Sequence, residues 1–243
     1  MRRISLHLAL VAAALGFALS ANSAHALIVT VGCVNTNLSC TLQELAAGGS
    51  IRVDGQRFDN WVVNNASSVP VDLSGIVVAG LDDQSTSPGL RYIAQGPLNT
   101  LGLDLIDLDL RFAVATIAGS TGIAGTSLQI DQFAFGADNV GGFIGISEDV
   151  FEANGVDLLG EQLAFIDSSS GSMILSDAIF FGSRASIVVA TNIIVTGDDS
   201  GDTVSLGRFT QRFVQIPEPS TLLLILVGLT GLSLRRASEL DSR

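Results

Sequence analysis

Carboxylates are almost the only side chains in this sequence that could do chemistry. The two histidines, His7 and His25, lie near the N-terminus, and lysine is absent from all 243 residues. Residues 27–216 contain seven arginines and 21 aspartates and glutamates, which gives this segment a net charge of −14. Without histidine or lysine, it is excluded from Ser-His-Asp and Cys-His catalysis, histidine-ligated metal sites and Schiff-base chemistry. A glycosidase carboxylate pair, an aspartic dyad and a calcium-assisted site are left open.

Three aspartates, Asp198, Asp199 and Asp202, surround a glycine and are the candidate calcium ligands. They lack the residue order of an EF-hand and its bidentate glutamate at the twelfth position. A solvated hairpin turn accounts for the same residues. We therefore predict no cofactor and no metal site, with this cluster as the one weak calcium candidate.

A glycosidase acid could come from Glu148, Asp149 or Glu152. Such a pair is defined by the distance between two carboxyl groups in space, so no spacing in the sequence identifies it. We assign no catalytic residue and predict that the protein is not an enzyme.

A further acidic row, Asp104, Asp107 and Asp109, is interleaved with apolar residues. The doublet Leu105-Ile106 interrupts the alternation, which predicts a β-bulge there. Otherwise the row is expected to face solvent, partly balanced by Arg111.

Apolar and polar residues alternate along the segments that contain these carboxylates, and this period of two predicts an all-β domain over residues 27–215. Apolar residues alternate with others over 108–114 and 187–195. Further strands are expected at 27–31, 50–53, 58–63, 75–79, 90–94, 128–135, 143–148, 162–166, 172–175, 178–181 and 203–214. So many short strands with turn residues between them indicate a β-sandwich or jelly roll, with a β-solenoid as the weaker alternative. No helical pattern is long enough for a βαβ crossover, which disfavours a parallel α/β sheet.

One short helix, about residues 42–47, is predicted near the N-terminus of this domain. Thr41 and Glu44 have the spacing of a capping box, and Gly48-Gly49 would end the helix. Just before it lie the only cysteines, Cys33 and Cys40. A local disulfide is the natural interpretation for an exported chain. A free redox pair is the alternative, but the Cys-x-x-Cys spacing is missing.

The N-terminus has the organisation of a secretory signal peptide over residues 1–26. Met1-Arg2-Arg3 is followed by an apolar run to Leu19 and by an A-x-A cleavage site at Ala24 and Ala26. The secretion machinery and signal peptidase are the expected partners. A retained anchor is less consistent with so short a run.

The C-terminus, residues 216–243, reads as a marginal membrane span. Pro217-Glu218-Pro219 precedes an uncharged apolar segment, 220–234, and Arg235-Arg236 follows it. A helix starting near Pro219 would be ~24 Å long, short of the ~30 Å hydrocarbon core. The arginines favour a cytoplasmic C-terminus. Packing of this helix inside the β domain is the alternative, although the prolines separate it from the fold.

These C-terminal residues resemble the PEP-CTERM sorting tail, which exosortase-type membrane enzymes recognise in bacteria that make exopolysaccharide. The resemblance implies cleavage near the Pro217-Glu218-Pro219 triplet, so that the anchor is temporary. Residues 48–61 and the run from 194–197 through 209–213 are similar to the ectodomain of such proteins. That likeness implies a β-rich exported domain and no catalytic residues.

We therefore expect a cell-surface or extracellular-matrix protein that is anchored in the inner membrane transiently and then released. A structural or adhesive role with extracellular polysaccharide as partner is favoured, and a polysaccharide hydrolase using paired carboxylates is the alternative. The acidic composition disfavours nucleic acid as a partner, because like charges repel.

Overall fold

The computed structural model describes residues 28–34, 38–83, 86–117, 121–138 and 140–215. The predicted signal cleavage site (Ala24, Ala26), the sorting residues (Pro217, Glu218, Pro219, Arg235, Arg236) and the apolar segment 220–234 lie outside the described residues. Within the described ranges, no helix has the length and apolar character that crossing a bilayer requires.

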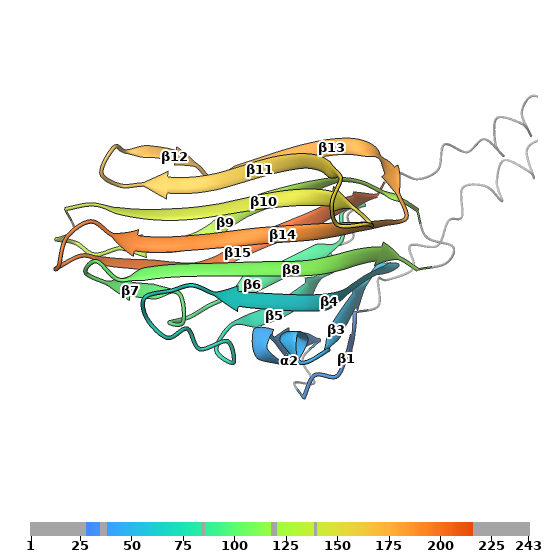
Figure 1. The fold of residues 1–243 in the computed structure, drawn as a ribbon, viewed down its shortest axis with the longest axis horizontal. Helices are drawn as coiled ribbons and strands as arrows, with labels where there is room; N and C mark the ends of the chain where they lie inside the picture. The colour runs from blue at the N-terminus through green and yellow to red at the C-terminus, as the bar shows by residue number, and fades with distance from the viewer. Residues whose placement is uncertain (1–27, 35–37, 84–85, 118–120, 139, 216–243) are drawn as a thin grey trace, which may run out of the picture.

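Two antiparallel sheets face each other and form a sandwich (Figure 1). Sheet A has eight strands, in the spatial order β1 (Val29–Val31), β3 (Ser50–Val53), β4 (Gln56–Asn65), β8 (Leu105–Thr116), β14 (Ser186–Gly197), β10 (Gly142–Glu152), β11 (Leu158–Asp167) and β12 (Ser172–Ile174). Sheet B runs β13 (Ser176–Arg184), β9 (Ile123–Phe135), β15 (Thr203–Gln215), β6 (Gly89–Ile93), β5 (Val77–Leu81) and β2 (Ser39–Thr41), and β7 (Asn99–Leu101) pairs with β15. The prediction of an all-β sandwich is confirmed.

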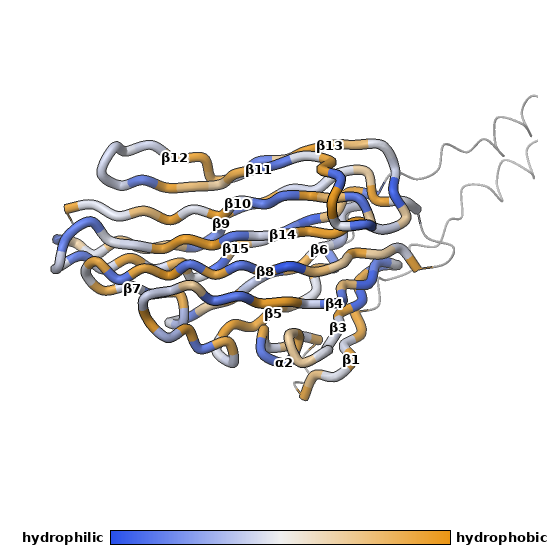
Figure 2. Tube along the Cα trace, in the orientation of Figure 1, coloured by the Kyte–Doolittle hydropathy of each residue, from blue (hydrophilic) through white to orange (hydrophobic). Residues whose placement is uncertain are grey.

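Strict alternation of burial builds the core between the sheets. In β8, Leu108, Leu110, Phe112 and Val114 are at most 1% exposed, whereas the side chains between them face outward. β14 behaves in the same way, and Figure 2 shows apolar and polar positions alternating along many of the long strands. The pleat sends successive side chains to opposite faces, so one face of each sheet is buried and the other remains in solvent.

The predicted bulge at Leu105-Ile106 is wrong. β8 begins at Leu105 and pairs with β14 without a register shift from there to Ala115. The irregularity lies in β4 instead, where the register to β8 shifts between Asp59 and Val62 and Asn60 has a φ of 57°. The extra residue resets the alternation, so Trp61 turns into the core and stacks on Phe112 with ring centroids 4.3 Å apart.

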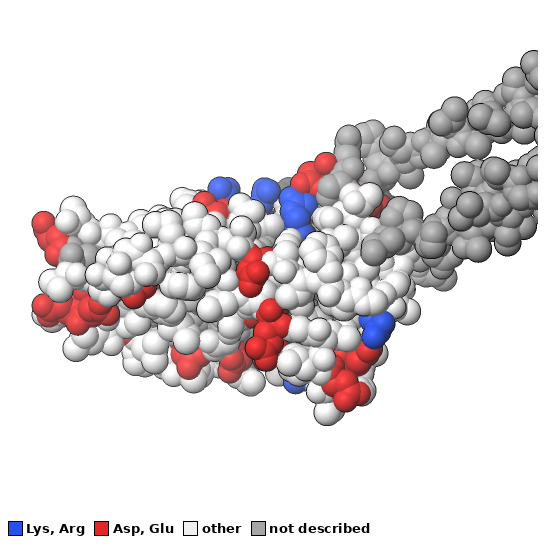
Figure 3. Space-filling model, turned by 90° about the horizontal axis from the view of Figure 1, so that it is seen from above, with Lys and Arg blue, Asp and Glu red and all other residues white. Residues whose placement is uncertain are grey.

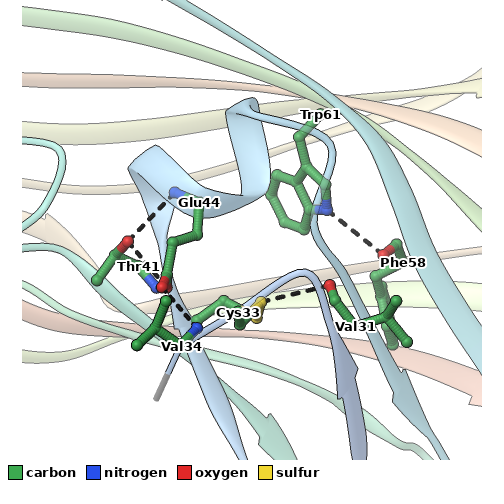
Figure 4. The surroundings of a disulfide bond; sticks show 8 residues. Val31, Cys33, Val34, Thr41, Glu44, Phe58 and Trp61 are labelled. Carbon is green, nitrogen blue, oxygen red and sulfur yellow. Dashed lines mark hydrogen bonds between the residues drawn. A yellow bond between two sulfur atoms is a disulfide. The ribbon is translucent and has the colours of Figure 1, made fainter.

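The predicted helix is α2 (Leu42–Ala46), and its capping box is formed. The Glu44 backbone N–H donates to Thr41 Oγ1 at 3.2 Å, and the Thr41 N–H donates to Glu44 Oε2 at 2.7 Å (Figure 4). Gly48 follows with a φ of 102°, a backbone conformation that suits glycine. The predicted disulfide between Cys33 and Cys40 is also confirmed, with their Cα atoms 5.2 Å apart. It ties the segment after β1 to the strand that leads into the helix.

Candidate functional site

The most unusual chemical group in the domain is a carboxylate buried between the two sheets. Glu148 on β10 is 0% exposed, because its side chain points to the same interior side of the strand as those of Ile146 and Val150. Its two oxygens accept hydrogen bonds from the Nε2 atoms of Gln162 on β11 and Gln211 on β15. Since β15 belongs to sheet B, the group links the two layers of the sandwich.

Two threonines complete this cluster. Gln162 Nε2 also donates to Thr126 Oγ1 at 2.9 Å, and Gln211 Nε2 donates to Thr191 Oγ1 at 2.7 Å. The Oε1 atoms of both glutamines are buried and have no hydrogen-bond partner among the described residues. A neutral Glu148 would be a hydrogen-bond donor, and rotation of either amide would offer it one of these acceptors.

Burial decides the protonation of this group. Desolvation raises the pKa of Glu148 from 4.5 to about 7, although hydrogen bonds from Gln162, Thr126 and Gln211 act to lower it. The buried Tyr92 has its pKa raised, first by its own burial and second by the charge of Glu148. Because solvent and substrate do not reach Glu148, the arrangement suits a proton-binding group of the core and not a catalytic acid.

The other two glycosidase candidates are not brought to this position. Asp149 follows Glu148 on the same strand and therefore faces the outer side of sheet A. Glu152, at the end of β10, accepts the Arg184 Nε–H at 2.7 Å in a surface ion pair. The structure thus places Glu148, Asp149 and Glu152 in three different environments.

Asp202 is the second buried carboxylate, at 1% exposure. It ends the turn between β14 and β15, and it accepts backbone N–H groups of Val140 at 2.7 Å, Gly141 at 3.3 Å, Asp198 at 3.0 Å and Asp199 at 2.8 Å. Burial would raise the pKa of Asp202, but these four donors together hold it below its usual value.

The sequence predicted a solvated turn here, with calcium as the alternative. The turn is confirmed, and Asp198 and Asp199 are exposed, but Asp202 is not solvated. Its oxygens already receive N–H donors that anchor residues 140–141 to the turn. Among the described residues, no group of three acidic, histidine or cysteine side chains could hold a metal ion.

A surface groove of about 580 Å³ lies between the segment before β5 and the β6–β7 connection. Pro70 and Pro97 contribute apolar walls, and Asp72, Asn99 and Asp104 contribute polar groups. Hydrogen bonds from the Ser74 side chain and backbone lower the pKa of Asp72. A glycosidase acid needs a raised pKa, so Asp72 does not fit that role.

The outer faces of the two sheets differ in charge. On sheet A, the predicted acidic row is confirmed for Asp107 and Asp109, whose Oδ1 atoms accept Asn192 Nδ2 at 2.7 and 2.8 Å. Asp149 and Glu161 lie on the same face. On sheet B, Arg91, Arg208 and Arg212 lie on the neighbouring strands β6 and β15. In Figure 3, blue and red atoms are mixed along the upper long edge of the view, whereas red atoms predominate along the lower edge.

Comparisons with known proteins identify one segment. Residues 215–237 match the family described as the PEP-CTERM protein-sorting motif. The match spans all five predicted sorting residues (Pro217, Glu218, Pro219, Arg235 and Arg236) and confirms the resemblance of the tail. A comparison with curated proteins gives no match.

Several solved structures to which the domain is similar are carbohydrate-binding modules, and another is the enzymatically active domain of a bacteriophage tailspike protein. TmCBM27, described by its recognition of mannan, is 10% identical over 79% of this chain and 99% of its own, with a TM-score of 0.31. The xylan-binding module CBM15 is 13% identical over 79% and 99%, with a TM-score of 0.29. A family 11 module from Clostridium thermocellum, bound to a mixed-linked tetrasaccharide, is 11% identical over 65% and 91%, at 0.25. At such TM-scores the likeness carries no argument about function.

Proposed function

We propose that this chain, which carries a PEP-CTERM sorting motif, is an exported, non-catalytic protein of the cell surface or extracellular matrix that associates with polysaccharide. The match over residues 215–237 carries the proposal, because the motif implies export and sorting by an exosortase. The all-β domain is then the part that is delivered outside the cell.

The proposed route has three steps. Signal peptidase removes residues 1–26 after the secretion machinery engages them, and segment 220–234 then holds the chain in the inner membrane with its C-terminus in the cytoplasm. An exosortase-type enzyme next recognises the Pro217-Glu218-Pro219 triplet and removes the anchor. The mature domain reaches the surface or the matrix, where its negative charge favours solubility.

The carboxylate geometry supports a non-catalytic role over a hydrolase. Glycoside hydrolysis needs a protonated carboxylic acid and a second carboxylate on either side of a reachable bond. The group with a raised pKa, Glu148, is enclosed between the sheets, whereas the groove contains Asp72, whose pKa is lowered. In the described domain, the carboxyl group with a raised pKa, Glu148, is therefore buried, and the carboxyl group in the groove, Asp72, has a lowered pKa.

Mass spectrometry of the mature protein tests the sorting step. The full chain, Glu218→Ala and the control Glu239→Ala are produced in a host with an exosortase and in the same host without it. We expect the wild type and Glu239→Ala to lose the tail only when the enzyme is present, and Glu218→Ala to retain it.

A mature wild-type chain that still contains Leu222–Leu234 in the exosortase host would contradict the proposal. A separate assay addresses catalysis: incubation of the exported protein with polysaccharides is expected to release no reducing ends. Release that disappears in carboxylate variants would favour the hydrolase instead.

A further inference from the structure

The outer face of sheet B contains an arginine, Arg91, whose charge has no partner within the described part of the chain. Arg91 lies on β6, partly buried, and no hydrogen bond or ion pair joins its guanidinium to another described residue. Its Nε is enclosed and has no acceptor. In a segment with three times as many acidic residues as arginines, an unpaired and partly buried guanidinium is unexpected.

Arg208 lies close to it on the neighbouring strand. Arg91 is directly opposite Thr210 on β15, so Arg208 is its diagonal neighbour. Arg208 forms a long ion pair with Asp131, whose carboxylate lies 3.9 Å from Arg208 Nε and also accepts the Thr210 hydroxyl. Arg212, the other diagonal neighbour, is paired at both nitrogens with Asp83.

Two incompletely neutralised guanidinium groups at diagonal positions repel each other unless an anion lies between them. A planar guanidinium has its donors in a fork that matches a carboxylate, so the pair is suited to a carboxylate ligand.

Arg91 also belongs to a polar row that crosses sheet B. Residues directly opposite one another on successive strands are Ala79, Arg91, Thr210, Gln129 and Ser176. Gln129 and Ser176 are exposed, and Ala79 has a small side chain. With strands ~4.8 Å apart, the row is ~19 Å long. On one side of the two arginines, the row offers the amide of Gln129 and the hydroxyl of Ser176 to a chain of hydroxylated sugar units.

We propose that this face, with Arg91 and Arg208 as the clamp and Gln129 and Ser176 as flanking contacts, binds a polysaccharide that carries carboxylate groups. The proposal rests on the proposed function and specifies the class of polysaccharide. Because the domain has a net negative charge, it would repel a densely charged anion more strongly than one whose negative charges are widely spaced. Duplex DNA has one charge per ~1.7 Å, so the acidic remainder of the surface would repel it.

Binding of the exported protein to three probes tests the site: alginate, which is carboxylated, dextran, which is neutral, and double-stranded DNA. The informative variant is Arg91→Gln, which removes no side-chain hydrogen bond or ion pair among the described residues. Arg52→Gln on β3 is the matched control, because Arg52 is exposed and lies on the other sheet. Thermal melting of each variant verifies the fold.

We expect wild type and Arg52→Gln to bind alginate equally, Arg91→Gln to bind it at least about ten-fold more weakly, as loss of one charge-assisted hydrogen bond implies, and salt to weaken binding. Equal alginate affinity of Arg91→Gln and wild type overturns the site. Binding to dextran alone overturns the carboxylate clamp but leaves the proposed function standing. Failure to bind either polysaccharide overturns both, and tighter binding to DNA than to alginate replaces the ligand class.

Discussion

Replacing Glu148 with glutamine should abolish a pH dependence of stability that the wild-type protein shows between pH 5 and 7.5. The wild-type carboxyl has a pKa of about 7 in the folded state, because burial disfavours its charge, against 4.5 when it is solvated. A group with a raised folded pKa contributes stability that is complete below the unfolded pKa. That contribution is lost as the pH rises through the folded pKa.

The two pKa values give the size of the effect. A difference of 7 against 4.5 corresponds to about 3 kcal/mol of unfolding free energy, at 1.36 kcal/mol for each pKa unit. Both histidines precede residue 27, so the β domain contains no histidine that would titrate in this window. The wild type should therefore become less stable by about this amount from pH 4.5 to above pH 7, and Glu148→Gln should not.

Urea unfolding of the exported protein at a series of pH values measures this difference. Glu161→Gln is the matched control, since Glu161 is exposed on β11 beside Gln162, and its slope should equal that of the wild type. The reasoning is refuted if wild-type stability is constant from pH 5 to 7.5, or if Glu148→Gln keeps the wild-type slope.

Two other predictions concern the turn and the disulfide. Asp202→Asn should lower the melting temperature by several degrees, because its amide cannot accept all four backbone N–H groups; Asp199→Asn, which is exposed, should not. The deficit should shrink as the pH falls through the lowered pKa of Asp202, and a pH-independent deficit would contradict this cause. The Cys33→Ser/Cys40→Ser double variant should lose about 2 kcal/mol in urea unfolding, as expected for a short closed loop; an unchanged midpoint would show that the loop is ordered without it.

Local patterns in the sequence predicted most of the elements. The capping box, the cysteine pair and the long alternating runs each act over a few residues, so α2, the disulfide and the strands of the core were identified, although their bounds shifted. β2 (Ser-Cys-Thr) and β7 (Asn-Thr-Leu) were missed, because each is short, mostly polar and lacks the run of β-branched residues that marked the equally short β1. The C-terminal motif was read in full, since the order of its residues is itself the signal.

The strand pattern of the sequence also indicated which polar residues lie in the core, although the spacing of the carboxylates did not. Glu148, Gln162 and Gln211 each occupy a position in phase with buried apolar neighbours on their own strands, which marks them as interior. The expected bulge at Leu105-Ile106 failed because the doublet lies where β8 begins, and a strand start needs no correction of phase.

By itself the sequence therefore determined which side of each strand a residue occupies, together with the short-range signals at both ends of the chain. Only the tertiary structure decided which interior and exterior positions meet. Strand order joins Glu148 on β10 to Gln211 on β15 across the two layers, and register sets Arg91 diagonally beside Arg208. Both depend on contacts between segments distant along the chain, which the period of a single strand does not encode.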